Sequence, residues 1–230
     1  MSYYKSLIIN AYGRHDMFFF LTIYKWRIKT CDSIPLRMNY IFGNGRYAEL
    51  VRTSIKFYGQ QNIEAFIVDH EYILDDVLSR PQITLEKISK KNSSVFLGFT
   101  FENNKGPDFL ERIAARLLSL GLNLPGFDFS ERPDHLKNGQ GTQIFQNTYI
   151  DFSCSIGQFV QIRPGALIGH DTKIGDLTYI APGAKLGSYV KIEEKCFLGF
   201  GCTVAPYTRI GNNCLIGAGA VVSGVIPDFS

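Results

Sequence analysis

Large aliphatic residues recur at every sixth position through the second half of the chain. Each member of the series is Ile, Leu or Val: Ile144, Ile150, Ile156, Ile162, Ile168, Ile174, Ile180, Leu186, Ile192, Leu198, Val204, Ile210, Ile216 and Val222. The residue two positions earlier is small in every case: Thr142, Thr148, Cys154, Val160, Ala166, Thr172, Thr178, Ala184, Val190, Cys196, Cys202, Thr208, Cys214 and Ala220. In an extended segment, residues i and i−2 share one face, so each pair predicts a short strand with a common inward side.

Glycine often follows the aliphatic residue, and glycine suits the sharp turn that must separate such strands. The positions are Gly157, Gly169, Gly175, Gly187, Gly199, Gly211 and Gly217. Three segments close one triangular coil of about eighteen residues, and stacked coils form a parallel β-helix with a spacing of roughly 4.8 Å. We therefore expect a β-helix over residues 142–230.

Residues eighteen positions apart are expected to stack on one wall of this coil. The outward residues of the first wall are Gln143, Gln161, Tyr179, Phe197 and Leu215; those of the second are Tyr149, Leu167, Lys185, Thr203 and Val221; those of the third are Ser155, Lys173, Lys191 and Arg209. The apolar stripe on the first wall is unfavourable in water, so we expect a subunit interface there. The basic third wall is the expected solvent face, or a surface for phosphates.

The first half of the chain shows a different pattern. A short apolar strand from Asn39 precedes a helical pattern that places Tyr47, Leu50, Val51, Ile55 and Tyr58 on one face and ends at Gly59. Further strands are expected at 65–68 and 95–100, and a second helix from Pro107 to Gly121 has Leu110, Ile113, Ala114, Leu117 and Leu118 facing inward. This alternation predicts a small, Rossmann-like α/β domain with a parallel sheet over residues 38–121. Residues 122–141 are expected to be a linker, and residues 1–37 an extension without an assigned role.

A glycine-rich turn joins the first strand to the first helix. The run from Gly43 to Ala48 fits the G-x-G-x-x-A pattern, and Asp69 follows the next strand, where an acid could hold a ribose. Backbone N–H groups at a helix N-terminus can hold a phosphate, although an ordinary tight turn has the same pattern. A nicotinamide dehydrogenase is disfavoured, because the second half of the mononucleotide-binding sheet is missing.

Composition and charge narrow the class of protein. The chain has 230 residues, a formal net charge of +3 and no Lys/Arg cluster, so we expect no nucleic-acid partner. The longest early apolar run, Met17 to Tyr24, is about half a membrane span, so we expect no membrane association and a cytoplasmic location. Four of the five cysteines occupy the small inward position of the repeat, which favours structural thiols over disulfides or metal ligands.

The segments "GHDTKIGD" and "IAPGAKLGSYVKI" resemble the hexapeptide-repeat acyltransferases. The order of a glycine-turn α/β domain followed by the repeat resembles, over Met38 to Val222, bacterial sugar acetyltransferases that act on nucleotide-linked amino sugars or on sialic acid. The resemblance implies a left-handed β-helix, a homotrimer, and acetyl-CoA bound between neighbouring β-helices, without a metal. It also implies acetyl transfer to the amine of a nucleotide-linked amino sugar, which serves surface glycan synthesis.

The same resemblance implies the roles of individual residues. His170 matches the proposed general base of these enzymes, and Asp171 matches the acid beside it. The repeat independently places His170 at an outward corner of the coil. A solvated histidine without a catalytic role is the alternative at such a corner. Cofactor contacts carry over to Tyr179, Gly187, Ser188, Phe200 and Ala218, with the Ser188 N–H as the candidate oxyanion donor, and sugar-nucleotide contacts to Asn44, Gly45, Arg46 and Asp69.

The chain departs from its relatives in three respects. Ser188 stands where relatives usually have Gly, the glycine turn is one residue shorter, and the chain ends at Ser230 without the proline-containing tail of many relatives, which we expect to weaken CoA binding. Two alternatives to N-acetylation therefore stay open: O-acetylation of a sugar such as sialic acid, and a non-catalytic trimeric scaffold or sugar-nucleotide binding module.

Overall fold

The computed structural model describes residues 38–43, 45–59, 61–68, 81–88, 93–99, 106–131 and 138–230. The expected extension over residues 1–37, and the predicted substrate residues Asn44 and Asp69, lie outside these ranges. Within the described part of the chain, no helix is both long enough and apolar enough to span a membrane.

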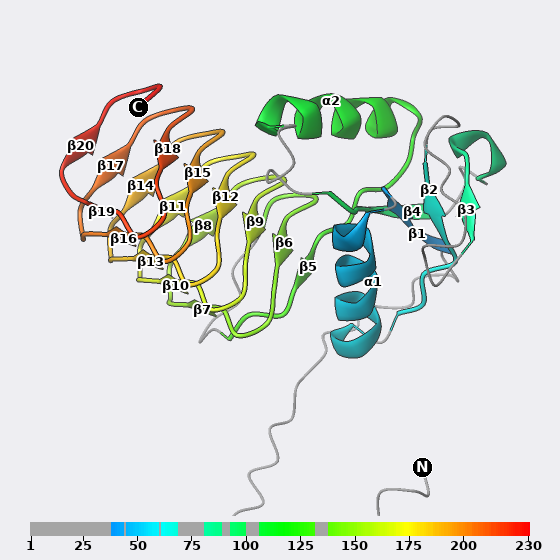
Figure 1. Cartoon of the computed structure of the whole chain (residues 1–230), viewed down its shortest axis with the longest axis horizontal. Helices are drawn as coiled ribbons and strands as arrows, with labels where there is room; N and C mark the ends of the chain where they lie inside the picture. Colours follow the sequence, from blue (N-terminus) through cyan, green and yellow to red (C-terminus); the bar gives the residue numbers. More distant parts are fainter. Residues whose placement is uncertain are drawn as a thin grey trace, which may run out of the picture. The chain divides into compact units, whose positions relative to one another are not determined.

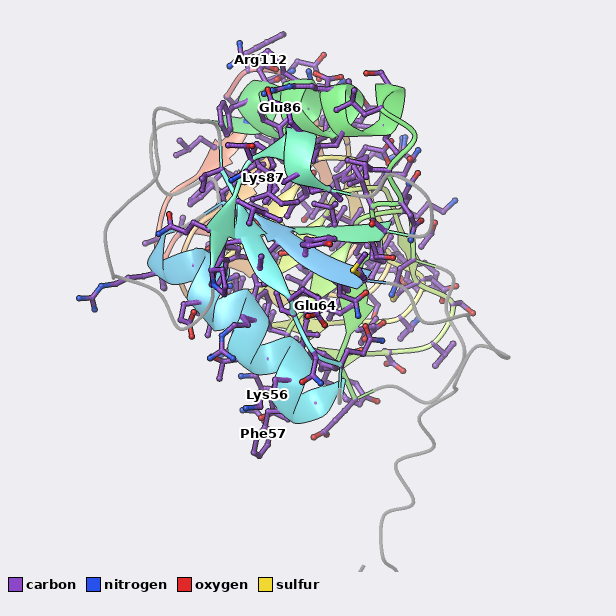
Figure 2. All side chains as sticks on the ribbon, turned by 90° about the vertical axis from the view of Figure 1, so that its right-hand side faces the viewer. Lys56, Phe57, Glu64, Glu86, Lys87 and Arg112 are labelled. Carbon is purple, nitrogen blue, oxygen red and sulfur yellow. The ribbon has the colours of Figure 1, made fainter. Side chains whose placement is uncertain are left out.

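The first part is an α/β unit around a four-stranded parallel sheet with the order β3-β2-β1-β4. Its elements are β1 (Met38–Phe42), α1 (Arg46–Tyr58), β2 (Ala65–Ile67), β3 (Gln82–Ile83), the 3₁₀ helix η2 (Leu85–Lys87), β4 (Ser93–Leu97) and α2 (Gly106–Ser119). Figures 1 and 2 show α1 and α2 on opposite faces of this sheet. The predicted βα series and parallel sheet are confirmed.

The two faces of the sheet follow from the alternation of side chains along each strand. Ile41, Phe66 and Phe96 pack with Val51 and Ile55 of α1. The alternate strand residues pack with Leu110, Ile113 and Leu117 of α2: Tyr40, Phe42, Ala65, Ile67, Val95 and Leu97. Each helix therefore buries one stripe against one face of the sheet.

The buried stripes of the helices are narrower than predicted. On α1 the buried residues are Ala48, Val51, Ser54 and Ile55, whereas Leu50 and Tyr58 are exposed. Leu118 of α2 is exposed as well. Successive residues of a helix are turned by about 100°, so these apolar side chains lie at the edge of the buried stripe. The prediction that Leu118 faces inward was wrong.

Residues 143–226 form the predicted β-helix, in which each strand pairs in parallel with the strand one coil away (Figure 1). The first wall comprises β5 (Phe127–Asp128), β6 (Gln143–Ile144), β9 (Gln161–Ile162), β12 (Tyr179–Ile180), β15 (Phe197–Leu198) and β18 (Leu215–Ile216). The second comprises β7 (Tyr149–Ile150), β10 (Leu167–Ile168), β13 (Lys185–Leu186), β16 (Thr203–Val204) and β19 (Val221–Val222). The third comprises β8 (Ser155–Ile156), β11 (Lys173–Ile174), β14 (Lys191–Ile192), β17 (Arg209–Ile210) and β20 (Val225–Ile226).

The interior of the β-helix is filled by the residues of the sixfold pattern. The large aliphatic residues and Cys154, Cys196, Cys202 and Cys214 form one buried cluster, and these four cysteines are free thiols. Polar residues in the small position are accommodated because they donate to a backbone carbonyl of the next coil, as Thr172 does to Gly187 and Cys196 to Gly211. Burial raises the pKa of Cys196 and of Cys202 to about 11, which keeps both thiols protonated.

The β-helix begins before the predicted boundary. Within the expected linker, β5 pairs with β6, and isolated bridges join Glu131 to Tyr149 and Asn138 to Ile156. Phe127 pairs with Gln143, two residues short of the eighteen-residue spacing, so the sixfold pattern does not reach this coil. The described residues of the expected linker, 122–131 and 138–141, are thus part of the folded unit, with Leu122 and Leu124 buried in the core of the α/β unit.

The first wall is covered by the chain's own α/β unit. The side-chain amides of Gln143 and Gln161 donate to the carbonyls of Leu97 and Phe99, and Tyr179 is fully buried at 0% exposure. Of the predicted outward stripe, only Leu215 is exposed, at 67%. An intermolecular interface at Tyr179 was therefore a wrong prediction, because an intramolecular contact already removes that side chain from water.

Candidate active site

His170 lies at a corner of the β-helix between the second and third walls, which we call the His170 corner (residues 151–154, 169–172, 187–190 and 205–208). The chain leaves β10 at Ile168 and enters β11 at Lys173, and Asp171 takes a left-handed conformation with φ of 57°. Such a conformation turns the chain sharply and directs the side chains outward. The side chains of His170 and Asp171 keep exposures of 31% and 35%, so both are accessible.

The two side chains are joined by a hydrogen bond of 2.8 Å between Nδ1 of His170 and Oδ2 of Asp171. An ionised carboxylate only accepts hydrogen bonds, so Nδ1 is assigned as the donor. In the neutral imidazole the other nitrogen, Nε2, then carries the lone pair. The pair therefore presents a base at Nε2, backed by a carboxylate at Nδ1.

Aromatic residues of neighbouring coils pack around the imidazole. The ring of Phe152 is stacked on that of His170 at a centroid distance of 5.0 Å, and Tyr189 meets it edge-on at 5.1 Å. Tyr207 in turn stacks on Tyr189 at 5.0 Å. These contacts restrict the imidazole ring. Sequence reasoning missed them, although Phe152 precedes His170 by one coil and that spacing is a usable signal.

Gly169 makes room for the coil that follows His170. A Cβ at Gly169 would lie 2.7 Å from the backbone nitrogen of Ser188 and 2.9 Å from its Oγ. The N–H of Tyr189 donates to the carbonyl of His170 at 3.0 Å, which fixes the two coils in register. Among the described residues, no backbone carbonyl accepts the N–H of Ser188.

A groove runs along the third wall from the His170 corner. Its volume is about 340 Å³, and its lining consists of Asp171, Lys173, Tyr189, Val190, Lys191, Tyr207 and Arg209. Lys191 forms an ion pair with Glu193. The cations of this groove favour ligands that carry phosphate groups. A larger cavity of about 450 Å³ lies against residues 123–128 and 138–142, and none of its lining residues belongs to the His170 corner.

The structure divides the predicted cofactor residues into three groups. Gly187 and Ser188 lie on the His170 corner, one coil after His170. Phe200, 53% exposed, and Ala218 lie on the corner between the first and second walls, which we call the Phe200 corner (residues 163–166, 181–184, 199–202 and 217–220). Tyr179 is buried, stacked on Phe197 at 5.0 Å. Within a single chain, only Gly187 and Ser188 of the predicted cofactor residues thus lie at the same corner as His170.

Two of the predicted substrate residues, Gly45 and Arg46, lie at the start of α1, whereas Asn44 and Asp69 lie outside the described residues. Gly43 has φ of 119°, and a Cβ there would lie 2.9 Å from the carbonyl oxygen of Gly98, so the turn requires glycine at this position. Gly45 is the N-cap of α1 and Arg46 is its exposed first residue. A Cβ added at Gly45 would meet no atom within 4 Å. A side chain at position 45 would therefore clash with none of the described residues.

No metal site is evident in the described ranges, where no three or more His, Cys, Asp or Glu side chains are grouped closely enough to hold an ion. Cys154, Cys196, Cys202 and Cys214 lie inside the β-helix, apart from His170 at its corner.

Comparisons with known proteins identify the repeat and the fold. The model of the bacterial transferase hexapeptide (six repeats) matches residues 153–188 and 189–224. Among solved structures, a mutant perosamine N-acetyltransferase from Caulobacter crescentus, in complex with CoA and GDP-perosamine, is 22% identical with a TM-score of 0.73, covering 85% of this chain and 93% of that chain. The comparison with curated proteins finds no match.

Two further solved structures have the same fold. The acetyltransferase domain of PglB from Neisseria gonorrhoeae, in complex with acetyl coenzyme A, is 21% identical with a TM-score of 0.74, covering 84% of this chain and 94% of that chain. WeeI from Acinetobacter baumannii is 20% identical with a TM-score of 0.70, with the same coverage of 84% and 94%. The expected combination of an α/β unit and a hexapeptide β-helix is thereby confirmed.

Proposed function

We propose that this chain, which carries the bacterial transferase hexapeptide repeat, is an acetyl-CoA-dependent acetyltransferase that acetylates the amine of a nucleotide-linked amino sugar. The observation that carries the proposal is the His170–Asp171 pair, held at an exposed corner with Nε2 open. The solved relatives support the choice of ligands, because their structures hold CoA and GDP-perosamine, or acetyl coenzyme A. The product would serve surface glycan synthesis from cytoplasmic precursors.

In the proposed reaction, acetyl-CoA supplies a thioester carbonyl that the amine of the acceptor attacks. Nε2 of His170 takes the proton that the amine loses, and later returns it to the departing thiolate of CoA. A positioned base of this kind contributes about 10²–10⁴ in rate. Asp171 holds the required tautomer and stabilises the imidazolium while it exists.

The carbonyl oxygen gains negative charge during the attack and needs a donor. The N–H of Ser188 is our candidate, since it lies one coil after His170 and no backbone carbonyl among the described residues accepts it. Gly169 supports this role by leaving the space that Ser188 occupies. The serine therefore keeps the backbone donor that a glycine would offer.

A homotrimer accounts for the separation of the predicted cofactor residues. Phe200 and Ala218 lie on a different corner from His170, so one chain cannot use all of them on one CoA. In the proposed assembly, the Phe200 corner of one subunit faces the His170 corner of its neighbour. Mixing a His170→Ala variant with a Phe200→Asp variant should then restore part of the lost activity, because some sites in mixed trimers are intact; no recovery would exclude a shared site.

The test of the function is release of CoA thiol from acetyl-CoA in the presence of candidate acceptors. The panel contains UDP-, dTDP- and GDP-linked amino sugars, free sialic acid and CMP-linked sialic acid. Release with one amino sugar, absent in His170→Ala, supports the proposal and identifies the nucleotide. Release only with a hydroxyl acceptor would favour O-acetylation instead. If no acceptor in the panel causes thiol release while CoA still binds to the protein, the non-catalytic scaffold alternative would be favoured.

A further inference from the structure

Four aromatic rings form a column along the His170 corner, one from each of four successive coils. The ring of Phe152 is stacked on the imidazole of His170 at an interplanar angle of 4°, and Tyr189 meets the imidazole edge-on at 83°. Tyr207 is stacked on Tyr189 at 5°. We call Phe152, His170, Tyr189 and Tyr207 the aromatic ladder. The base of the proposed reaction is therefore the second ring of a continuous ladder.

Packing of the protein core does not explain the rings of the aromatic ladder. Phe152 and Tyr189 are each 47% exposed, and Tyr207 is 72% exposed. None of the three belongs to the hydrophobic clusters of the described residues. Apolar surface left in water contributes nothing to the hydrophobic stabilisation of the fold. The contact that distinguishes these exposed rings is the contact with the base.

The backbone of the two tyrosines supports this reading. Tyr189 and Tyr207 have φ of 59° and 64°, a left-handed conformation that is unfavourable for a bulky side chain. Two other bulky residues in this conformation have partners in the α/β unit, since Leu177 is buried in its core and Lys195 pairs with two carboxylates of α2. Among the described residues, the ring contacts of the two tyrosines are with each other and with His170. The strained backbone is thus associated with the base.

The ring contacts complete the constraints on the imidazole of His170. The carboxylate of Asp171 holds Nδ1 at 2.8 Å, Phe152 covers one face of the ring, and Tyr189 contacts it from the next coil. The Cβ–Cγ torsion of a histidine has broad minima, so an exposed imidazole held by a single hydrogen bond can rotate and break that bond. A general base acts only while its lone pair lies within hydrogen-bond reach of the proton that it takes. The rings therefore bear on the alignment of Nε2.

We propose that Phe152 and Tyr189 are positioning residues, which hold the imidazole of His170 in the rotamer that bonds Asp171 and leaves Nε2 to the acceptor amine. Tyr207 supports Tyr189 by stacking on it. The proposal rests on the proposed function and adds residues outside the His–Asp pair. Phe152 acts during the reaction as well, because the imidazolium that forms when Nε2 takes the proton lies over a ring face, and ring faces attract cations. The ladder thus acts on the chemical step and not on ligand binding.

The kinetic test compares Tyr189→Leu and Phe152→Leu, which each remove a ring, with Tyr189→Phe, which keeps it. In the leucine variants kcat should fall by about tenfold or more, because a catalytic group misplaced by ~1 Å can cost about 10²-fold in rate. KM for acetyl-CoA and for the acceptor should be unchanged, and Tyr189→Phe should keep the wild-type kcat. Phe229→Leu is the matched control, since Phe229 is 78% exposed and has φ of 58° but lies at another corner.

Three kinetic outcomes would overturn the positioning role. The first is a wild-type kcat in both leucine variants. The second is a raised KM for the acceptor at unchanged kcat, because Tyr189 lines the groove beside the base and would then be a substrate contact. The third is a Tyr189→Phe variant as slow as Tyr189→Leu, because the hydroxyl and not the ring would then be required.

Nitrogen NMR reads the state of the imidazole directly, without any substrate. The full-length protein is labelled at its four histidines, and the His170 signals are identified by their loss in His170→Ala. At a pH at which the imidazole is neutral, the wild type and Phe229→Leu should show one tautomer, with the proton on Nδ1. Tyr189→Leu and Phe152→Leu should show a mixture of the two tautomers. A single tautomer in all of these proteins would show that Asp171 alone fixes the ring, which overturns the proposal.

The outcomes distinguish this proposal from the proposed function. Wild-type kcat and a single tautomer in the leucine variants overturn the positioning role and leave acetyl transfer standing. Mixed tautomers in the leucine variants, without thiol release by the wild type from any acceptor, support the positioning of His170 and contradict the acetyltransferase.

Discussion

Nδ1 of His170 and Oδ2 of Asp171 lie 2.8 Å apart at a corner of the β-helix, although the two residues are adjacent in sequence. The left-handed conformation of Asp171 is what allows this contact, because it turns the backbone between the two outward side chains. Among the described residues, nine others that are not glycine share that conformation, including Ser153, Tyr189 and Tyr207 at the same corner. The hydrogen-bonded pair thus uses a feature that the repeat provides at each coil.

Removal of the charge from Asp171 should impair acetyl transfer while leaving the fold intact. In Asp171→Asn, the neutral amide no longer stabilises the imidazolium. A positioned base supplies a rate enhancement of about 10²–10⁴-fold, and kcat should lose part of this enhancement. Asp176→Asn is the matched control, since Asp176 is also a corner acid but bonds the backbone of Gln158 at another corner. Equal kcat values in the two variants would contradict the role of Asp171.

Gly169→Ala should disturb Ser188 and lower both activity and stability. The added Cβ would lie 2.7 Å from a backbone nitrogen, which cannot move without shifting the coil, and overpacking of this kind costs about 1–3 kcal/mol. Gly217→Ala is the control for stability, because a Cβ there meets no described atom within 4 Å. Thermal unfolding of the two variants is compared, and kcat of Gly169→Ala is compared with that of the wild type. A Gly169→Ala variant as stable as Gly217→Ala and as active as the wild type would exclude a requirement for close approach.

The interior thiols should make the protein less stable at alkaline pH. Burial raises the pKa of Cys196 and Cys202 from 9.0 to about 11, so between these values the unfolded thiols lose protons while the folded ones keep them. The free energy of unfolding should therefore fall as pH rises from 9 to about 11. Denaturant unfolding of the wild type is compared with Cys202→Ala, which should show a smaller decrease. An equal decrease in both proteins would contradict the assignment to Cys202.

Gln143→Ala should weaken the contact between the α/β unit and the β-helix. Gln143 donates to the carbonyl of Leu97 at 2.6 Å and accepts from the hydroxyl of Tyr47 at 3.0 Å. The carbonyl of Leu97, left without this donor in a buried place, costs about 1–3 kcal/mol, so the free energy of unfolding should fall by about that amount. Gln140→Ala, at an exposed position, is the control for denaturant unfolding. A loss no larger than in that control would show that the contact contributes little.

The sequence was most informative where one residue type repeats at a fixed spacing. Ile168, Leu186 and Val204 stack in the register that the eighteen-residue coil predicts, since each aliphatic side chain has only one inward face to occupy. The corner position of His170 follows from the same spacing. The contact with Asp171 needed the backbone geometry as well, because adjacent residues do not ordinarily bond to each other through their side chains.

Long-range packing was beyond the reach of the sequence pattern. Tyr179 reads as an outward residue, and only the placement of the α/β unit on the first wall shows that it is buried. Arg163 is buried as well, with its guanidinium over the rings of Tyr47 and Phe145, which lie in different parts of the chain. The coil at β5 escaped prediction because its spacing is two residues shorter than the repeat.

The most direct measurement is the rate of thiol release from acetyl-CoA with the preferred acceptor, in the wild type and in His170→Ala. The native oligomer mass of the variant is first shown to equal that of the wild type. Loss of the base should lower kcat by about 10²–10⁴, with acetyl-CoA binding retained. A His170→Ala protein that folds normally and turns over at the wild-type rate would contradict the proposed mechanism, because His170 would then not be needed as the base.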